Sequence, residues 1–372
     1  MFPAEKALSN ALQKREEQDL LRKLSLVTKS IDFTSNDYLG FATSPELYNM
    51  IEDKIAKSEK RLGSGGSRLL SGNSKEAEEL ESFLAKQHNS AAALLFNSGY
   101  DANVGLFSSV AKKGDTILYD ELVHASIHDG IRLTRADSFP FRHNDMVHLE
   151  ERLKQSKGNI FVAIESIYSM DGDLAKIVEC VALCKKYNAN CIIDEAHATG
   201  VYGLGLVQNL KTEKDVFARI HTFGKAMGCH GAVVIGSDIL KKYLVNYARS
   251  FIYTTALPLH SLISIECAYQ FLEKSNNTVI KLHENIKYFQ EKIQHSEKYK
   301  WLDSNSAIQS LIVPGNSEVR ILCQKIQEKD MDVRPILSPT VPKGKERIRV
   351  CLHSYNTKAE IDLLLRTIND KL

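Results

Sequence analysis

The sequence has no excess of either charge and no long apolar run. Its 372 residues include 48 Lys and Arg against 46 Asp and Glu, for a formal net charge of +2. Because the positive and negative charges nearly cancel, we do not expect nucleic acid or an anionic membrane as a partner. The first 24 residues lack the apolar core of a signal peptide, and no later stretch has a membrane-spanning length. We therefore expect a cytoplasmic enzyme.

Paired cysteines are also missing. The seven cysteines run from Cys180 to Cys351, and the three closest, Cys180, Cys184 and Cys191, form no C-x-x-C pair. We expect reduced thiols rather than disulfides or a zinc site. His124 and His128 share a helical face, but no glutamate lies between them and no third ligand is evident. The sequence therefore predicts no metal site.

Several common catalytic signatures are absent. The glycine-rich stretch "GSGGS" (63–67) leads into no G-x-x-x-x-G-K-[ST] phosphate loop, and Arg68 replaces the last glycine of a G-x-G-x-x-G fingerprint. No G-x-S-x-G elbow of a serine hydrolase occurs. Neither an internal repeat nor a low-complexity tract is visible. These absences exclude the simplest nucleotide-binding and hydrolase interpretations.

Apolar strands alternate with helical stretches through the first three quarters of the chain. We expect strands at 91–96, 115–119, 159–166, 190–196 and 231–236. Helices are expected at 102–111, 124–135, 146–156 and 175–187. Continuous apolar strands that alternate with helices predict an α/β fold, with a largely parallel sheet covered on both faces.

Both ends of the chain differ from this alternating region. The stretch 4–24 reads as an amphipathic helix with an approximate leucine stripe, 31–41 is turn-rich, and Ser74 caps a helix that continues to about residue 89. After residue 275 a long polar helix (276–294) precedes strands near 308–313, 332–336 and 347–352 and a helix over 357–370. We expect an N-terminal segment (1–45), a large domain (46–275) and a small α+β domain (276–372).

Four chemically capable side chains fall at the expected edges of the sheet. Asp194 and His197 stand in "IIDEAHATG", Ser169 in "AIESIYSMDGD" and Lys225 in "HTFGKAMG". A single strand-terminal acid could simply cap the next helix. The four together suit an aldehyde cofactor that a lysine holds as a Schiff base and whose pyridine nitrogen an acid keeps protonated. A lysine in so apolar a stretch is expected to have a lowered pKa.

Two further stretches would complete such a site. The segment "NSGYDANVGL" (97–106) places a glycine turn at the start of a helix, where backbone N–H groups bind phosphate. His124, in "DELVHASIHDG", supplies a flat ring that could lie over the pyridine. The chemistry expected from the residues alone is therefore that of pyridoxal phosphate.

Eight motifs in order carry a resemblance to a known family. They are "SNDYLGF", "GSGGSRLLSGN", "NSGYDAN", "HASIHDG", "ESIYSMDGD", "DEAHATG", "TFGKAMG" and "PTVPKGKERIRV". The chain resembles the α-oxoamine synthase family of fold-type-I pyridoxal-phosphate enzymes nearly from end to end. The resemblance implies the fold-type-I transferase fold, a mostly parallel seven-stranded sheet, pyridoxal 5'-phosphate as cofactor, and a homodimer with shared active sites.

The resemblance also assigns roles in cofactor binding and catalysis. Lys225 would bind the cofactor aldehyde, Asp194 would pair with the pyridine nitrogen, and His124 would stack on the ring. His197 and Ser169 would bond the phenolic oxygen. The catalytic set is thus Lys225, His124, Asp194 and His197.

The same resemblance implies which residues bind the cofactor phosphate and the substrate. The phosphate would be held by Ser98, Gly99, Tyr100 and Thr222, with Thr340 reaching the phosphate of the neighbouring subunit. Asn36, Arg349 and Arg22 match positions that hold the amino-acid carboxylate, a task that suits a guanidinium. Arg22 could equally be a solvated residue of a charged helix. Asn36 and Thr340 are expected to act partly across the dimer.

The implied activity is that of an acyltransferase. An amino acid condenses with an acyl thioester on coenzyme A or acyl carrier protein, and CO₂ and the thiol are released. The stretch "GSGGSRLLSGN" favours L-alanine with a pimeloyl thioester, a step of biotin biosynthesis. Relatives that use glycine with acetyl- or succinyl-coenzyme A, or serine with palmitoyl-coenzyme A, keep most of the same residues. An aminotransferase and a non-catalytic protein of the same fold are the more distant alternatives.

Overall fold

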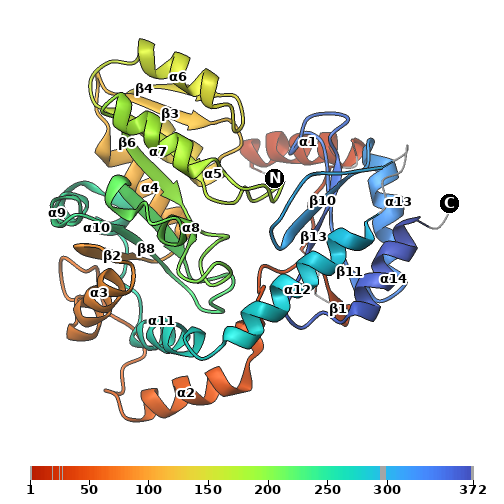
Figure 1. The fold of residues 1–372 in the computed structure, drawn as a ribbon, viewed down its shortest axis with the longest axis horizontal. Coiled ribbons are helices and arrows are strands. Elements are labelled where there is room, and N and C mark those ends of the chain that lie inside the picture. The colour runs from red at the N-terminus through yellow and green to blue at the C-terminus, as the bar shows by residue number, and fades with distance from the viewer. Residues whose placement is uncertain (1, 19, 25, 27, 294–298, 370–372) are drawn as a thin grey trace.

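A seven-stranded sheet forms the larger of two lobes (Figure 1). The structure is a computed structural model that describes residues 2–18, 20–24, 26, 28–293 and 299–369. Strands β7, β6, β5, β3 and β4 are parallel, and β8 is antiparallel to both β7 and β2. In spatial order the strands are β2 (Ala92–Phe96), β8 (Ala232–Gly236), β7 (Ala218–Thr222), β6 (Asn190–Asp194), β5 (Ile160–Glu165), β3 (Thr116–Asp120) and β4 (Asp137–Phe141).

Helices cover both faces of this sheet, as the continuous apolar strands predict. Side chains from one face share a core with α4 (Gly99–Val110), α5 (Ala125–Leu133), α9 (Asp238–Tyr247) and α10 (Arg249–Ile252). Those from the other face share a core with α3 (Lys75–Gln87), α6 (Met146–Gln155), α7 (Ile177–Lys186) and α11 (Leu259–Leu272). Helix α2 (Pro45–Ala56) packs on α11. In β6, Ile192 faces the first core and Ile193 the second.

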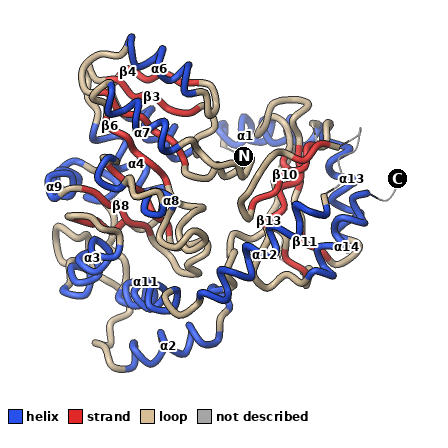
Figure 2. Tube along the Cα trace, viewed as in Figure 1, coloured by secondary structure: helices blue, strands red, loops and turns tan. Residues whose placement is uncertain are grey.

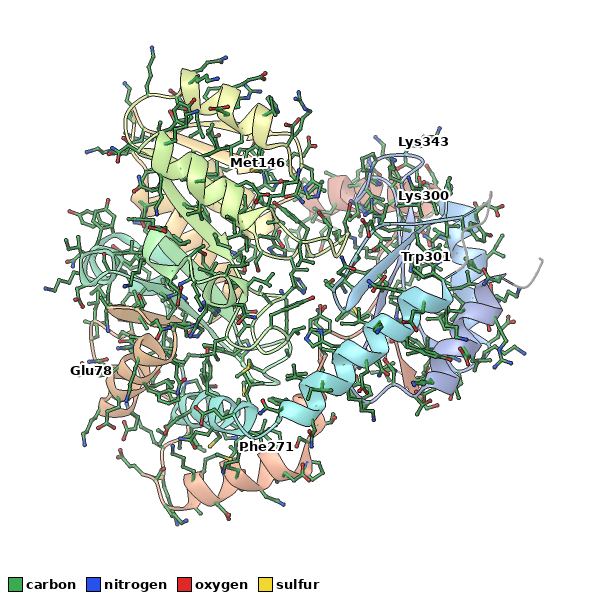
Figure 3. The ribbon with its side chains drawn as sticks, viewed as in Figure 1. Glu78, Met146, Phe271, Lys300, Trp301 and Lys343 are labelled. Carbon is green, nitrogen blue, oxygen red and sulfur yellow. The ribbon has the colours of Figure 1, made fainter. Side chains whose placement is uncertain are left out.

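The smaller lobe is built on an antiparallel sheet of four strands. Their order is β12 (Pro335–Ile336), β13 (Arg347–Cys351), β10 (Ile308–Ile312) and β9 (Lys300–Trp301). It is accompanied by α12 (Asn276–Lys292), α13 (Asn316–Gln327) and α14 (Lys358–Asn369), and β1 (Ile31–Asp32) pairs in parallel with β11 (Met331–Asp332). Trp301 lies in this lobe (Figure 3), with its ring edge-on to Phe289 at 5.1 Å between centroids.

The turn over residues 169–173, which follows β5, joins the two lobes. Its backbone oxygens accept hydrogen bonds from the smaller sheet: Ser169 from Arg349 Nε at 2.6 Å, and Met170 from Ser310 Oγ at 2.6 Å. Gly172 has φ +81°, and an added Cβ would lie 2.1 Å from the Ile308 oxygen, so glycine is required there. Loops of the larger lobe lie on the side that faces the smaller lobe (Figure 2). This turn therefore sets where the smaller lobe presents Arg349.

The five strands expected in the large sheet are confirmed within one or two residues at their ends, and the four helices between them within three. Strands β4 and β7 of this sheet were not predicted. Pro140 in β4 argues against a strand, although an exposed edge strand tolerates proline, and β7 carries Arg219 and His221 between its apolar residues. The expected strand 332–336 is instead two short strands, β11 and β12. Helices α2, α9, α11 and α13 were not predicted. The two short 3₁₀ turns (Phe41–Thr43 and Glu213–Asp215) and α8 (Leu206–Asn209) complete the elements.

The prediction of one helix over 4–24 is wrong, because α1 ends at Glu17 (Pro3–Glu17). Its leucines are exposed, Leu8 by 63% and Leu12 by 55%, and α1 has no buried residue. A short helix depends on packing of its apolar face, and α1 lacks it within the described chain. Residues 20–24 leave the helix and lie beside Thr340. Positions 19, 294 and 370, which were assigned to helices, lie outside the described residues.

Three cysteines that are separate in sequence meet in the core. The sulfur atoms of Cys180, Cys184 and Cys191 lie within 4.8 Å of one another, and all three side chains are buried. They are free thiols, as are the other four cysteines. No helix in the part of the chain that the structure describes is both long and apolar enough to cross a membrane.

Candidate active site

A cavity of about 270 Å³ opens at the carboxyl ends of the central parallel strands, where ligands bind in α/β sheets. The residues predicted for the site that line it are Ser98, Gly99, Tyr100, His124, Asp194, Thr222 and Lys225. The lining residues that were not predicted are Asn103, Ser126, Glu165, Ala196, Gly224, His230 and Gly231. The sheet thus brings together side chains from five separate segments of the chain.

The start of α4 forms an anion-binding end of this cavity. Ser98 caps the helix, and its Oγ accepts a hydrogen bond from the Asp101 N–H at 3.1 Å. The first N–H groups of a helix have no intrahelical partner and attract anions. A Cβ on Gly99 would lie 2.3 Å from Thr222 Cγ2. Thr222 Oγ1 is buried without a hydrogen-bond partner among the described residues. This end therefore offers unpaired donors beside a glycine that keeps the space open.

Asp194 supplies a fixed negative charge at the end of β6. The side chain is 4% exposed. One carboxylate oxygen accepts from Asn103 Nδ2 at 2.7 Å, and the other from the Ala196 N–H at 2.9 Å. These two donors hold the carboxylate in a fixed orientation. The arrangement suits a partner that carries a positive N–H group, as a protonated pyridine does.

A chain of polar contacts connects Lys225 with Arg349. Lys225 Nζ lies 3.0 Å from His197 Nε2, and His197 Nδ1 lies 2.8 Å from the Tyr38 hydroxyl. Arg349 Nη2 donates to that hydroxyl at 3.4 Å and to Asn36 Oδ1 at 2.9 Å. An amine and a guanidinium therefore face the same site, bridged by a tyrosine and a histidine.

Burial shifts the proton equilibria along this chain. It lowers the pKa of Lys225, although the negative charge of Asp194 opposes the shift. Burial also lowers the pKa of His197 well below its usual value, and the positive charge of Lys225 adds to this effect. His197 is therefore a neutral imidazole near pH 7, and the amine of Lys225 gives up its proton more easily than that of a solvated lysine.

His124 caps α5 at the rim of the cavity. Its Nδ1 accepts a hydrogen bond from the Ser126 N–H at 3.2 Å and lies 2.7 Å from Ser126 Oγ. These two contacts hold one edge of the imidazole, whereas the residue as a whole remains exposed. A ring fixed in this way is free to lie against a flat ligand.

Two residues predicted for the site lie away from this cavity. Thr340 and Arg22 hydrogen-bond to each other at 3.2 Å and line a separate groove of about 730 Å³ beside Met170. Ser169 approaches the site through its backbone, since its oxygen accepts from Arg349 Nε. The described chain therefore brings together the cofactor-type residues and Arg349, but not Thr340 or Arg22.

The residues of the site that were not predicted from the sequence include three with a polar side chain inside a motif that was quoted for the resemblance. Tyr38 connects His197 with Arg349, Asn103 orients Asp194, and Glu165 lines the cavity. All three stand inside motifs used for the resemblance, "SNDYLGF", "NSGYDAN" and "ESIYSMDGD". Their place inside such a motif was the available signal. The contacts themselves depend on the tertiary fold.

The residues present fit pyridoxal 5'-phosphate. The start of α4 and the unpaired Thr222 hydroxyl suit the phosphate, and Asp194 suits the pyridine nitrogen. Lys225 places an amine with a lowered pKa in the same cavity. An aldehyde, an aromatic nitrogen and a phosphate on one molecule would each meet a matching group.

Comparisons with known proteins point the same way. The profile of the aminotransferase class I and II family matches residues 28–368. The 8-amino-7-oxononanoate synthase of Emericella nidulans is 44% identical over 388 residues, covering 97% of this chain and 94% of that protein. The structure of 8-amino-7-oxononanoate synthase from Francisella tularensis is 29% identical, with a TM-score of 0.76 over 91% of this chain and 96% of that chain.

A second solved structure shares the fold at lower identity. Serine palmitoyltransferase from S. paucimobilis, in complex with PLP and myriocin, has a TM-score of 0.87 over 99% of this chain and 98% of that chain, at 23% identity. The resemblance inferred from the eight motifs and the expected fold-type-I transferase fold are thereby confirmed. The chain belongs to the aminotransferase class I and II family of pyridoxal-phosphate enzymes, as one of its α-oxoamine synthases.

Proposed function

We propose that the protein condenses L-alanine with a pimeloyl thioester to give 8-amino-7-oxononanoate, CO₂ and the free thiol, a step of biotin biosynthesis. The observation that carries the proposal is the chain of contacts from Lys225 to Arg349. An amine and a guanidinium linked in one site support a substrate that carries both an amino group and a carboxylate, as an α-amino acid does. The 44% identity to an 8-amino-7-oxononanoate synthase over nearly the whole chain supports the choice of reaction.

Each group of the site has a role in this chemistry. When bound, pyridoxal phosphate supplies a conjugated ring that accepts the electron pair released at the amino-acid Cα. Arg349 would bind the substrate carboxylate through its guanidinium, which Asn36 keeps in place. Lys225 Nζ, whose pKa is lowered, takes the proton from Cα. Asp194 holds positive charge at the ring nitrogen.

His197 and Tyr38 position these groups. The neutral imidazole of His197 keeps Lys225 Nζ within 3.0 Å of Nε2, and the Tyr38 hydroxyl holds its other nitrogen. The proposed contact of His197 and Ser169 with the phenolic oxygen would use the same side of the cavity. We further propose that His124 covers the ring, because its imidazole is fixed at one edge and exposed.

A homodimer in the cytoplasm is the proposed working form. Thr340 lies in a groove away from Lys225, and it would reach a phosphate only in a partner subunit. The exposed leucines of α1 provide apolar surface for such an interface. The thioester carrier is either coenzyme A or acyl carrier protein.

A second candidate is a sister enzyme that joins serine to palmitoyl-coenzyme A, since a serine palmitoyltransferase structure covers 99% of the chain. A pocket that differs by one methyl discriminates by only about 1–3 kcal/mol. The two functions separate in one assay. Thiol release from pimeloyl-coenzyme A is measured with alanine, glycine and serine. Strong release with alanine alone supports the proposal. Release only with serine or glycine, or only after the acyl chain is changed, assigns the protein to a sister enzyme.

A further inference from the structure

Glu165 is a second acid of the cavity, and the cofactor chemistry does not use it. It ends β5 directly beside Asp194, its register partner at the end of β6. The side chain is 2% exposed and lines the cavity. Among the residues that the structure describes, its Oε1 is fully buried and has no hydrogen-bond partner. An unpaired buried oxygen at a ligand cavity indicates a partner that arrives with the ligand.

A second buried glutamate shows how unusual this is. Glu195 follows Asp194 in sequence, and it too is fully buried. Its oxygens accept hydrogen bonds from the N–H groups of Leu206 at 2.9 Å and Val207 at 2.7 Å. Glu195 therefore has a structural role that accounts for its burial. Both oxygens of Glu195 are paired in this way, whereas the backbone N–H groups of His124 and Ser169 beside Glu165 leave its Oε1 without a partner among the described residues.

The surroundings of Glu165 favour its neutral form. Burial raises its pKa well above the usual value, and the negative charge of Asp194 raises it further. The positive charge of Lys225 and the backbone N–H groups of His124 and Ser169 oppose this shift without reversing it. Arg349 and Tyr168 are the other titratable neighbours. Two adjacent carboxyl groups in a buried site do not both ionise, and Asp194 has the better donors.

A neutral carboxylic acid donates one hydrogen bond. The amino-acid carboxylate is assigned to Arg349 and Asn36, and the phosphate to α4 and Thr222. The thioester carbonyl oxygen is the acceptor that remains without a donor. As the C–C bond forms at the thioester carbonyl carbon, the carbonyl π pair moves onto this oxygen. When the pair returns, the C–S bond breaks and the thiolate leaves. Donors placed at such an oxygen are a large source of catalysis.

We propose that Glu165 is held as a neutral carboxylic acid and donates its O–H to the carbonyl oxygen of the acyl thioester. The proton stays on Glu165 throughout, so the step requires no further reactant. This inference rests on the proposed function, because it concerns the thioester half of that reaction. A carboxyl kept neutral by its surroundings so that it can donate to a developing oxyanion is a known solution in other enzymes.

The first test is the protonation state, which does not depend on turnover. An infrared difference spectrum is recorded between the wild-type holoenzyme and Glu165→Gln at neutral pH. The expected result is a carbonyl band of a protonated carboxylic acid that is lost in the variant. Carboxylate bands alone would overturn the proposal.

The second test separates donation from charge. The Glu165→Gln side chain still donates a hydrogen bond, whereas Glu165→Ala donates none. With pimeloyl-coenzyme A, kcat/KM is expected to fall less than about 10-fold in Glu165→Gln. It should fall about 10²–10³-fold in Glu165→Ala. The KM for alanine should change little in either. A glutamine variant as slow as the alanine variant would overturn the proposal, and so would a defect confined to alanine binding.

Two further readouts keep the outcomes distinct. Above the pKa of Glu165 the wild-type thioester step should slow as the O–H is lost, and Glu165→Gln should lack this decline. The melting temperature and cofactor absorbance of each variant show whether it is folded and loaded. If the wild type releases no thiol with any amino acid, the proposed function fails, and the infrared band still decides the protonation of Glu165.

Discussion

The Tyr38 hydroxyl lies 2.8 Å from His197 Nδ1 and 3.4 Å from Arg349 Nη2. Tyr38 is therefore the side chain through which the amine end of the site is tied to its carboxylate end. Because it is fully buried, its hydroxyl has no water to replace these partners.

Replacing Tyr38 by phenylalanine should weaken alanine binding without unfolding the protein. A hydrogen bond to a charged group contributes about 1.5–3 kcal/mol, so we expect the KM for alanine to rise about 10-fold or more. The KM for the thioester should stay unchanged. Tyr269→Phe is the matched control, since Tyr269 is equally buried but its hydroxyl bonds His88. Equal alanine KM values in the two variants would contradict the role given to Tyr38.

Replacing Gly99 by alanine should reduce affinity for pyridoxal phosphate. The added Cβ would lie 2.3 Å from Thr222 Cγ2, so Thr222 or the start of α4 must shift. Cofactor affinity is measured by absorbance titration of the cofactor-free protein. Gly63→Ala is the control, because its Cβ would meet nothing within 4 Å. Cofactor binding by Gly99→Ala that equals the control would contradict the assignment of the phosphate to this helix end.

His143 should make the stability depend on pH. Its Nδ1 lies 2.9 Å from Asp120 Oδ1 and its Nε2 2.7 Å from Asp173 Oδ2. Burial lowers its pKa, but these two hydrogen bonds outweigh burial and raise the pKa to about 10. In the unfolded chain it is about 6.5. The stabilisation by protonated His143 is therefore complete below about pH 6.5, and it is lost as the pH rises through about 10.

Urea unfolding of the wild type and His143→Gln measures this effect. The difference in unfolding free energy should be largest at the acidic end of that window and should shrink as the pH rises. A difference that stays constant with pH would show that His143 does not carry the charge.

Mixing two inactive subunits tests the shared active site. If Thr340 acts on the partner's phosphate, a hybrid of Lys225→Ala and Thr340→Ala subunits contains one intact site. The hybrid should then be more active at limiting cofactor than either parent dimer. Activity no higher than the mean of the two parents would indicate that each site is built within one chain.

The sequence predicted the largely parallel sheet because it depends on local patterns, and local motifs likewise gave the candidate cofactor residues. Apolar strands and helix starts are short-range features, and Asp194 stands in a predicted strand, whereas the strand before Lys225, β7, was not predicted. Contacts between distant segments were not predictable in this way. Tyr38 contacts His197 and Arg349, which are 159 and 311 positions away from it in the sequence. The proposed neutral state of Glu165 depends on Asp194 in the neighbouring strand.

The N-terminal helix shows that a local pattern can also predict too much structure. Its leucine periodicity predicts a continuous helix over 4–24, yet the observed helix ends at Glu17 with its leucines exposed. Periodicity identifies an apolar face but not the surface that covers it. That surface is absent from the described part of this chain, in agreement with the proposed dimer.

The fate of the alanine carboxyl group tests the central claim most directly. The holoenzyme is given pimeloyl-coenzyme A and L-alanine that is isotopically labelled at the carboxyl carbon or at Cα, and the products are measured by mass spectrometry. We expect the carboxyl label in CO₂, the Cα label in a nine-carbon amino ketone, and one thiol for each CO₂. Both labels in pyruvate, with no thiol released, would indicate an aminotransferase and contradict the account.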